Sequence, residues 1–166
     1  MCDDILTGIR DLTEYRRTSL PPKDTSKDMV ILKLYHEYLT WNEARKFCIA
    51  EGGQLATIRS REEAEIMASY NRETDTGRKP GVVSNGVFLG FHDYYHLGEW
   101  VTIRGEPLSK TGYSTITQHW GGPPADGHFP DRPPKCGELA FDGGLNDAPC
   151  SSKRRFICEL PEQQKP

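Results

Sequence analysis

The cysteines are the residues of this chain whose types and spacing say most about its chemistry. Four of the five, Cys48, Cys136, Cys150 and Cys158, stand at wide and unequal separations, and no Cys-x-x-Cys pair occurs. This spacing argues against a zinc knuckle and against a thioredoxin-type redox site. An even set of four instead predicts two disulfide bridges formed in an oxidising compartment. The spacing leaves all three pairings open.

The other reactive side chains do not form a recognisable catalytic group. His92 and His96 are four residues apart, which suits a metal only on a helix, and the apolar strand before them predicts surface or turn histidines instead. His128 near Asp131 has no nucleophile to serve, and Cys48 is expected to be buried and bridged. These residues therefore predict no enzyme, and a hydrolase, which needs a base–nucleophile pair, is a remote alternative.

Composition narrows the class of partner. The chain has 166 residues, which fits one domain, and a formal net charge of −3, so no global basic field favours nucleic acid or an anionic membrane. No apolar run approaches the roughly 20 residues that span a bilayer. A local basic run from Ser151 to Arg155 either meets phosphate groups of a ligand or lies in a solvated turn.

The chain divides into a leader, a domain and a tail. Residues 1–28 are polar and are predicted to be a flexible N-terminal leader, residues 29–160 a globular domain, and residues 161–166 a C-terminal tail. The leader has no apolar region of a signal peptide, so secretion implies a mature chain, and a cytosolic chain with free thiols is the alternative. Cys2 or the segment around it provides a route to self-association, or Cys2 is an inert thiol.

Helix and strand signals are segregated along the domain. Thr40 with Glu43, and Ser60 with Glu63, form capping boxes that predict helices over about 41–51 and 61–71. Strands are predicted at 31–35, 54–58, 87–91, 99–103, 138–141 and 155–159, while 108–119 is ambiguous. Prolines and glycines predict an irregular loop over 121–135, and the residues before Cys150 a polar loop. The pattern indicates an α+β fold with a mainly antiparallel sheet.

Several segments together resemble C-type lectin-like domains. Residues 40–48 and 52–56 resemble the first helix and following strand of that family, and 87–91 its core strand. Leu145-Asn-Asp resembles the family's Trp-Asn-Asp motif, and 156–159 its terminal strand. Residues 98–102 and 105–122 look closest to insect hemolymph lipopolysaccharide-binding lectins. The resemblance covers about three quarters of the chain and implies the bridges Cys48–Cys158 and Cys136–Cys150.

The resemblance also implies a binding site for a sugar and calcium. Calcium takes six to eight oxygen ligands, and sugar hydroxyls can complete an open shell. Asn146 and Asp147 match the family's ligand pair, although they can equally cap a turn after two glycines. Pro124 matches the proline of the family's loop motif, and either Asp126 or Asp131 could replace a lost ligand. The carbohydrate site is therefore predicted at Pro124, Asp126, Asp131, Asn146 and Asp147, with Asp126, Asn146 and Asp147 as calcium ligands.

One departure from the family pattern leaves the function open. Pro134 stands where sugar-binding members have a glutamate ligand, and proline has no side-chain oxygen. The resemblance implies a secreted, extracellular pattern-recognition lectin of innate immunity that binds microbial glycans or lipopolysaccharide. The loss of the glutamate supports the alternative, a lectin-like module that binds protein without calcium.

Overall fold

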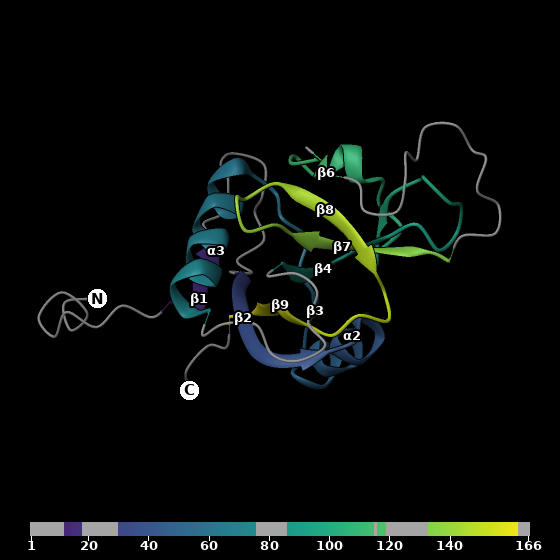
Figure 1. Cartoon of the computed structure of the whole chain (residues 1–166). Helices are drawn as coiled ribbons and strands as arrows, with labels where there is room; N and C mark the ends of the chain where they lie inside the picture. Colours follow the sequence, from purple (N-terminus) through teal and green to yellow (C-terminus); the bar gives the residue numbers. More distant parts are fainter. Residues whose placement is uncertain (1–11, 18–29, 76–85, 115, 119–132, 163–166) are drawn as a thin grey trace, which may run out of the picture.

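Two helices pack against one mixed sheet in the computed structural model, which describes residues 12–17, 30–75, 86–114, 116–118 and 133–162 (Figure 1). The helices are α2 (Trp41–Ala50) and α3 (Arg61–Thr74), with a 3-10 turn η1 (Leu108–Lys110). The strands are β1 (Glu14–Arg17), β2 (Val30–Leu39), β3 (Gln54–Leu55), β4 (Val87–His92), β5 (Val101–Thr102), β6 (Ile116–Gln118), β7 (Lys135–Leu139), β8 (Leu145–Pro149) and β9 (Arg154–Pro161). No helix in these ranges is long and apolar enough to cross a membrane.

The sheet is mainly antiparallel, as predicted. Its order is β1-β2-β9-β4-β7-β8-β6, with β3 paired to β9 and β5 paired to β4. Every pairing is antiparallel except β4 with β9 and β6 with β8. The α+β fold class is therefore confirmed.

The sheet lies between two apolar clusters, one with each helix. Phe88 belongs to the cluster under α2, whereas its neighbours Val87 and Leu89 belong to the cluster under α3. This alternation follows from the two-residue period of a strand, which sends successive side chains to opposite faces. The strands of the sheet centre are thus buried on both faces, and β4 is buried at every residue.

Both helices begin at the predicted caps. The Thr40 hydroxyl accepts a hydrogen bond from the Glu43 amide at 3.3 Å, and the Glu43 carboxylate accepts one from the Thr40 amide at 3.0 Å. At α3 the Ser60 hydroxyl accepts from the Glu63 amide at 3.1 Å, but the Glu63 carboxylate accepts from the Arg59 amide instead of the Ser60 amide. The second capping box is therefore only half formed.

Glu63 is drawn away from the cap by an arginine of β1. Arg17 donates to both Glu63 carboxylate oxygens, at 2.6 and 3.0 Å, and to the Thr57 carbonyl at 2.7 Å. Two parallel bonds to a carboxylate that is only 4% exposed fix the strand against α3. The sheet thereby extends into the segment 1–28, which the sequence assigned to a flexible leader; residues 1–11 and 18–29, with Cys2, lie outside the described residues.

The segment before Cys150 folds differently from the prediction. Residues 145–149 were expected to be a polar loop but form β8, which pairs with β7 in a continuous antiparallel ladder. The turn before β8 is capped by Asp142, whose carboxylate accepts from the Gly144 amide at 2.9 Å. Asn146 and Asp147 are thus ladder residues, and the interpretation that they cap a turn is wrong.

The two disulfide bridges are the ones that the family resemblance implied. Cys48 of α2 is bonded to Cys158 of β9 across a separation of 110 residues, and Cys136 of β7 is bonded to Cys150 across 14 residues. The first closes most of the domain into one loop. The second clamps the start of β7 to the end of β8.

Loop length predicts that the two bridges differ in their effect on stability. Replacing Cys48 and Cys158 by alanine should lower the free energy of unfolding by about 4–5 kcal/mol, and replacing Cys136 and Cys150 by about 3 kcal/mol, because the longer bridge removes more freedom from the unfolded chain. Guanidinium unfolding of both variants beside the parent measures the difference. Equal losses would contradict the loop-closure explanation.

Candidate functional site

The two strands that flank the predicted binding loop, β6 and β7, both pair with β8. The segment 119–132 begins directly after Gln118, whose partner across the β6–β8 pairing is Asn146. The chain returns through β7, where Lys135 pairs with Pro149 at the other end of β8. Pro124, Asp126 and Asp131 belong to this segment and lie outside the described residues. Of the five predicted carbohydrate-site residues, the structure therefore describes the two on β8.

The side chain of Asn146 is hydrogen-bonded to a buried acid, Glu138. Its amide nitrogen donates to Glu138 Oε1 at 3.0 Å, across the register pair of β7 and β8. Its side-chain oxygen is buried and has no hydrogen-bond partner among the described residues. Asp147, the next residue, is 4% exposed and stands opposite Gly137. The amide is thus fixed in orientation with an acceptor that is ready for a donor or a cation.

The acid beneath Asn146 belongs to a buried ion pair that sequence reasoning missed. Glu138 Oε2 lies 3.0 Å from Arg154 Nη1, with side-chain exposures of 1% and 3%, although the angle falls outside hydrogen-bond geometry. Arg154 also lies over the Phe88 ring, 5.8 Å from its centroid. Burial raises the pKa of Glu138 to about 7, against the opposing effect of Arg154. Desolvation dominates because neither charge reaches water.

The basic run 151–155 is divided: residues 151–153 form the solvent-accessible turn that was one of the two expectations, whereas its two arginines are buried. Lys153 is exposed, but Arg154 and Arg155 are 3% and 5% exposed. Arg155 donates to the side chain and the carbonyl of Asn71 and to Thr74 at the end of α3. Both expectations for this run, phosphate binding and a solvated turn, are wrong for its arginines, which serve as internal cross-links.

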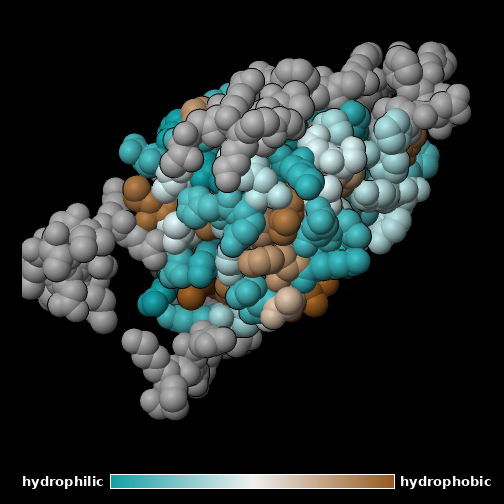
Figure 2. All heavy atoms as spheres, turned by 60° about the horizontal axis from the view of Figure 1, so that its bottom comes forward, coloured by the Kyte–Doolittle hydropathy of each residue, from teal (hydrophilic) through white to brown (hydrophobic). Residues whose placement is uncertain are grey.

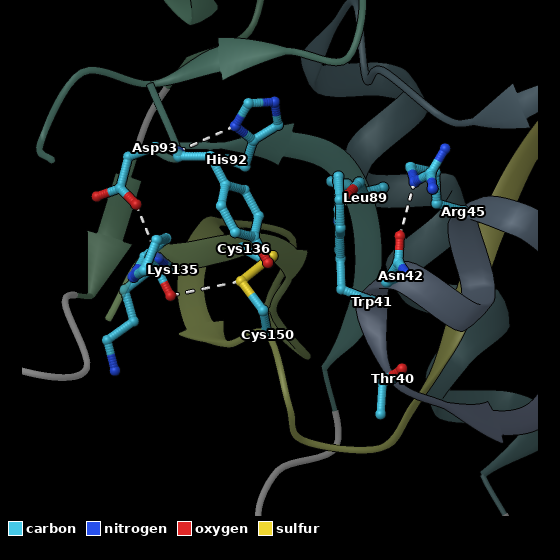
Figure 3. The surroundings of a disulfide bond; sticks show 12 residues. Thr40, Trp41, Asn42, Arg45, Leu89, His92, Asp93, Lys135, Cys136 and Cys150 are labelled. Carbon is cyan, nitrogen blue, oxygen red and sulfur yellow. Dashed lines mark hydrogen bonds between the residues drawn. A yellow bond between two sulfur atoms is a disulfide. The ribbon is translucent and has the colours of Figure 1, made fainter. Parts of the chain in front are cut away.

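A buried aspartate ties the loop exit to the turn after β4, and the sequence analysis missed it as well. Asp93 Oδ1 accepts from the Lys135 amide at 2.7 Å, and Oδ2 accepts from the Gly98 amide at 2.9 Å. Figure 3 shows Asp93 pointing toward Lys135 beside the Cys136–Cys150 bridge. The signal in the sequence was an aspartate directly after a predicted strand, since aspartate carboxylates commonly accept from backbone amides of a following turn.

The histidine pair does not form a metal site. His92 is 4% exposed within β4, whereas the side chain of His96 is 73% exposed. The prediction of a surface or turn residue therefore holds for His96 and is wrong for His92. Across the described ranges, no group of three or more histidine, cysteine or acidic side chains could hold a metal ion.

Comparison with known proteins identifies the fold family. The chain matches the lectin C-type domain over residues 37–160. It is also 34% identical to the hemolymph lipopolysaccharide-binding protein of Periplaneta americana over 162 residues, which cover 94% of this chain and 59% of that protein. The chain belongs to the C-type lectin domain family. Collectin-43 of Bos taurus is 26% identical over 150 residues, covering 90% of this chain and 42% of the relative.

Solved structures of C-type lectins share the fold. The mouse scavenger receptor C-type lectin carbohydrate-recognition domain superposes with a TM-score of 0.59 at 23% identity, covering 87% of this chain and all of that domain. Cow CD23, solved in the presence of an oligosaccharide, gives a TM-score of 0.58 at 20% identity, covering 89% of this chain and 100% of that one. At these identities the likeness shows the fold alone.

The β8 residues partly fit the calcium chemistry of a C-type lectin. The buried side-chain oxygen of Asn146 and the carboxylate of Asp147 are hard donors of the kind that calcium takes. Pro134 contributes only a backbone carbonyl, whose oxygen lies 3.5 Å from the disulfide-bonded sulfur of Cys150. Two side chains are too few for a calcium shell, so any further protein ligands would have to come from the segment 119–132.

The raised pKa of Glu138 predicts an unusual pH dependence of stability. Burial lifts this pKa from 4.5 to about 7, so the folded protein keeps a proton that the unfolded chain has released. Stability should therefore fall as the pH rises through this window, by up to about 3 kcal/mol.

Glu138→Gln isolates this effect because glutamine mimics the protonated acid. Urea unfolding at pH 5 and pH 7.5 should show a loss of stability in the parent that is absent in the variant. Other titrating groups are common to both proteins and cancel in the comparison. Parallel pH profiles would contradict the assignment.

Proposed function

We propose that this chain is a secreted pattern-recognition lectin that binds microbial surface carbohydrate, with lipopolysaccharide as the favoured class. The similarity to the hemolymph lipopolysaccharide-binding protein of Periplaneta americana supports the ligand class. The chain spans 59% of that relative's length, so the target is inferred for this domain and not for a whole protein. Two disulfide bridges support an oxidising, extracellular location.

The proposed binding surface is the loop 121–135 together with β8. The observation that carries it is the buried side-chain oxygen of Asn146, which has no hydrogen-bond partner in the described part of the chain. Asn146 lies on β8, the strand that pairs with both β6 and β7, between which the loop runs in the sequence. In this proposal Asp147 adds a carboxylate, and the loop segment contributes Pro124, Asp126 and Asp131. The surface binds and orients a glycan and performs no reaction.

Calcium is the proposed cofactor of this surface. Asn146, Asp147 and Asp126 would hold it, and vicinal hydroxyls of a sugar would complete the shell. The ion would supply charge and open coordination positions, while the Glu138 acceptor fixes the Asn146 amide nitrogen and leaves the amide oxygen available. With few side-chain ligands the affinity should be weak, roughly 0.1–1 mM, in the range of extracellular calcium modules.

The second candidate is a lectin-like module that binds protein without calcium. The specific observation in its favour is Pro134, which occupies the position of the family's glutamate and offers no side-chain oxygen. The neighbouring Lys135 amide already donates to Asp93, so it is not available to a ligand. In either case, association of chains through Cys2 or the N-terminal segment is part of the proposal.

Removing both β8 donors tests the proposed surface. Asn146→Ala combined with Asp147→Ala should weaken binding to a lipopolysaccharide-coated surface at least about tenfold, because two oxygen ligands are lost. The same variant should lose about 1–3 kcal/mol of stability, since Glu138 is left without its donor. Surface plasmon resonance, with circular dichroism to verify folding, measures both.

Two further variants separate binding from stability. Asp147→Asn keeps the shape of the side chain and removes only its charge, so binding should fall while the fold survives. Glu73→Gln removes one exposed carboxylate from α3 and should bind like the parent. Full binding by a folded Asp147→Asn variant and by the double variant would reject this surface.

Calcium dependence separates the two candidate functions. If the ion binds with the affinity above, about 10 mM calcium should stabilise the folded chain by about 1.4–2.7 kcal/mol. The melting temperature should then rise by about 3–8 °C and return with a chelator. Differential scanning calorimetry with calcium and with EDTA makes the measurement. A melting temperature that changes with neither calcium nor EDTA would favour the protein-binding module.

A further inference from the structure

Exposed apolar side chains converge on one groove that no β8 residue lines. The large hydrophobic residues exposed in the described part of the chain are Ile49, Tyr94, Tyr95 and Phe141. All but Phe141 line a single groove of about 730 Å³ between α2 and the turn after β4. Figure 2 turns the α2 side forward, and brown and tan side chains gather there among hydrophilic ones. Clustered apolar exposure of this kind marks binding sites.

The groove has a rigid aromatic wall. The His92 ring centroid lies 5.5 Å from that of Trp41 and 5.1 Å from that of Tyr95. Trp41 donates its indole N–H to the Leu89 carbonyl at 2.8 Å, and His92 Nδ1 accepts from the Tyr94 amide at 3.1 Å. Figure 3 shows Trp41 and His92 side by side next to the disulfide. The buried His92 ring therefore contacts the ring of Tyr95, which is 76% exposed.

Polar groups complete the lining. Asn42, Arg45 and Gln54 border the same groove. Arg45 donates through Nε to Asn42 Oδ1 at 2.9 Å, which orients the guanidinium while its two terminal nitrogens carry further donors. Flat aromatic faces beside amide and guanidinium donors suit a sugar ring, which has an apolar face and a rim of hydroxyls.

The charge of the groove is positive. Arg45 carries the only charged group among the described residues that line it, and no acidic side chain does so. Burial lowers the pKa of His92, so this ring is neutral at physiological pH. A guanidinium in a groove without acids favours an anionic ligand, and it binds carboxylate or phosphate through paired hydrogen bonds.

We propose that this groove is a second carbohydrate site, which binds a sugar ring that carries a carboxylate or phosphate group. The ring stacks on Tyr95 and Tyr94, and its acidic group pairs with Arg45. The site shares no residue with the β8 surface and does not need calcium. It goes beyond the proposed function, because it adds an independent binding site of stated ligand class.

Matched sugars test the ligand class directly. Titrations of the ¹⁵N-labelled chain with methyl glucoside, methyl glucuronide and glucose 6-phosphate compare the same ring without an acid, with a carboxylate and with a phosphate. EDTA is present throughout, which silences a calcium-dependent site at β8. Binding should move the Trp41 indole resonance and the amides of Tyr94 and Tyr95. The preferred acidic sugar should bind at least about tenfold more tightly than the glucoside, and the two acidic arms show whether carboxylate or phosphate is preferred.

Variants on the groove and outside it complete the test. Tyr95→Ala should weaken binding of the acidic sugar about five- to tenfold, and Arg45→Gln should remove the preference for the acid. Phe141→Ala deletes the exposed aromatic that lies outside the groove, and Lys46→Gln deletes the adjacent cation of α2; both should bind like the parent.

Equal affinity for neutral and acidic sugars, or no shift of the Trp41 indole with any of them, would overturn the proposal. So would equal losses in the Phe141→Ala and Lys46→Gln controls. Because EDTA is present, none of these results bears on the β8 surface, whose failure would appear only in the calcium and β8 experiments.

Discussion

The Cys48–Cys158 bridge is the constraint on which the rest of the domain depends, because it fixes the central strand to the first helix. Strand β9, which carries Cys158, pairs with β2, β3 and β4. The same strand also carries Arg154 and Arg155, two buried cations that reach in different directions. A buried charge is tolerated only when partners stand in fixed positions. The bridge helps to keep β9 where those partners are.

The candidate surface on β8 depends on this buried framework. Arg154 on β9 holds Glu138 on β7, and Glu138 accepts from the Asn146 amide on β8, so three strands set the orientation of one side chain. The second bridge, Cys136–Cys150, clamps the ends of β7 and β8 together. The described residues that would bind a ligand therefore sit on rigid elements.

Local pattern predicted the parts of this fold that local physics decides. The Thr40–Glu43 cap and the segregation of helices and strands led to the α+β class, whereas the disulfide pairing came from the family resemblance. Strand β8 was missed because Asn146 and Asp147 favour turns, and only distant partners such as Glu138 place them in a ladder. Arg154 and Arg155 were misread as surface charges for the same reason. Pro124, Asp126 and Asp131 stay predictions.

The two proposed binding surfaces are mechanically connected through Asp93. One of its carboxylate oxygens accepts from Lys135, where the β8 loop ends, and the other from Gly98, in the turn that follows the groove tyrosines. Its complete burial makes the connection stiff. Two weak sites held at a fixed separation raise each other's effective concentration for one polymer that reaches both. An anionic polysaccharide with a repeating unit would then be retained far more strongly than any of its single sugars. Such binding would favour a microbial surface, which carries many repeats, over a free saccharide.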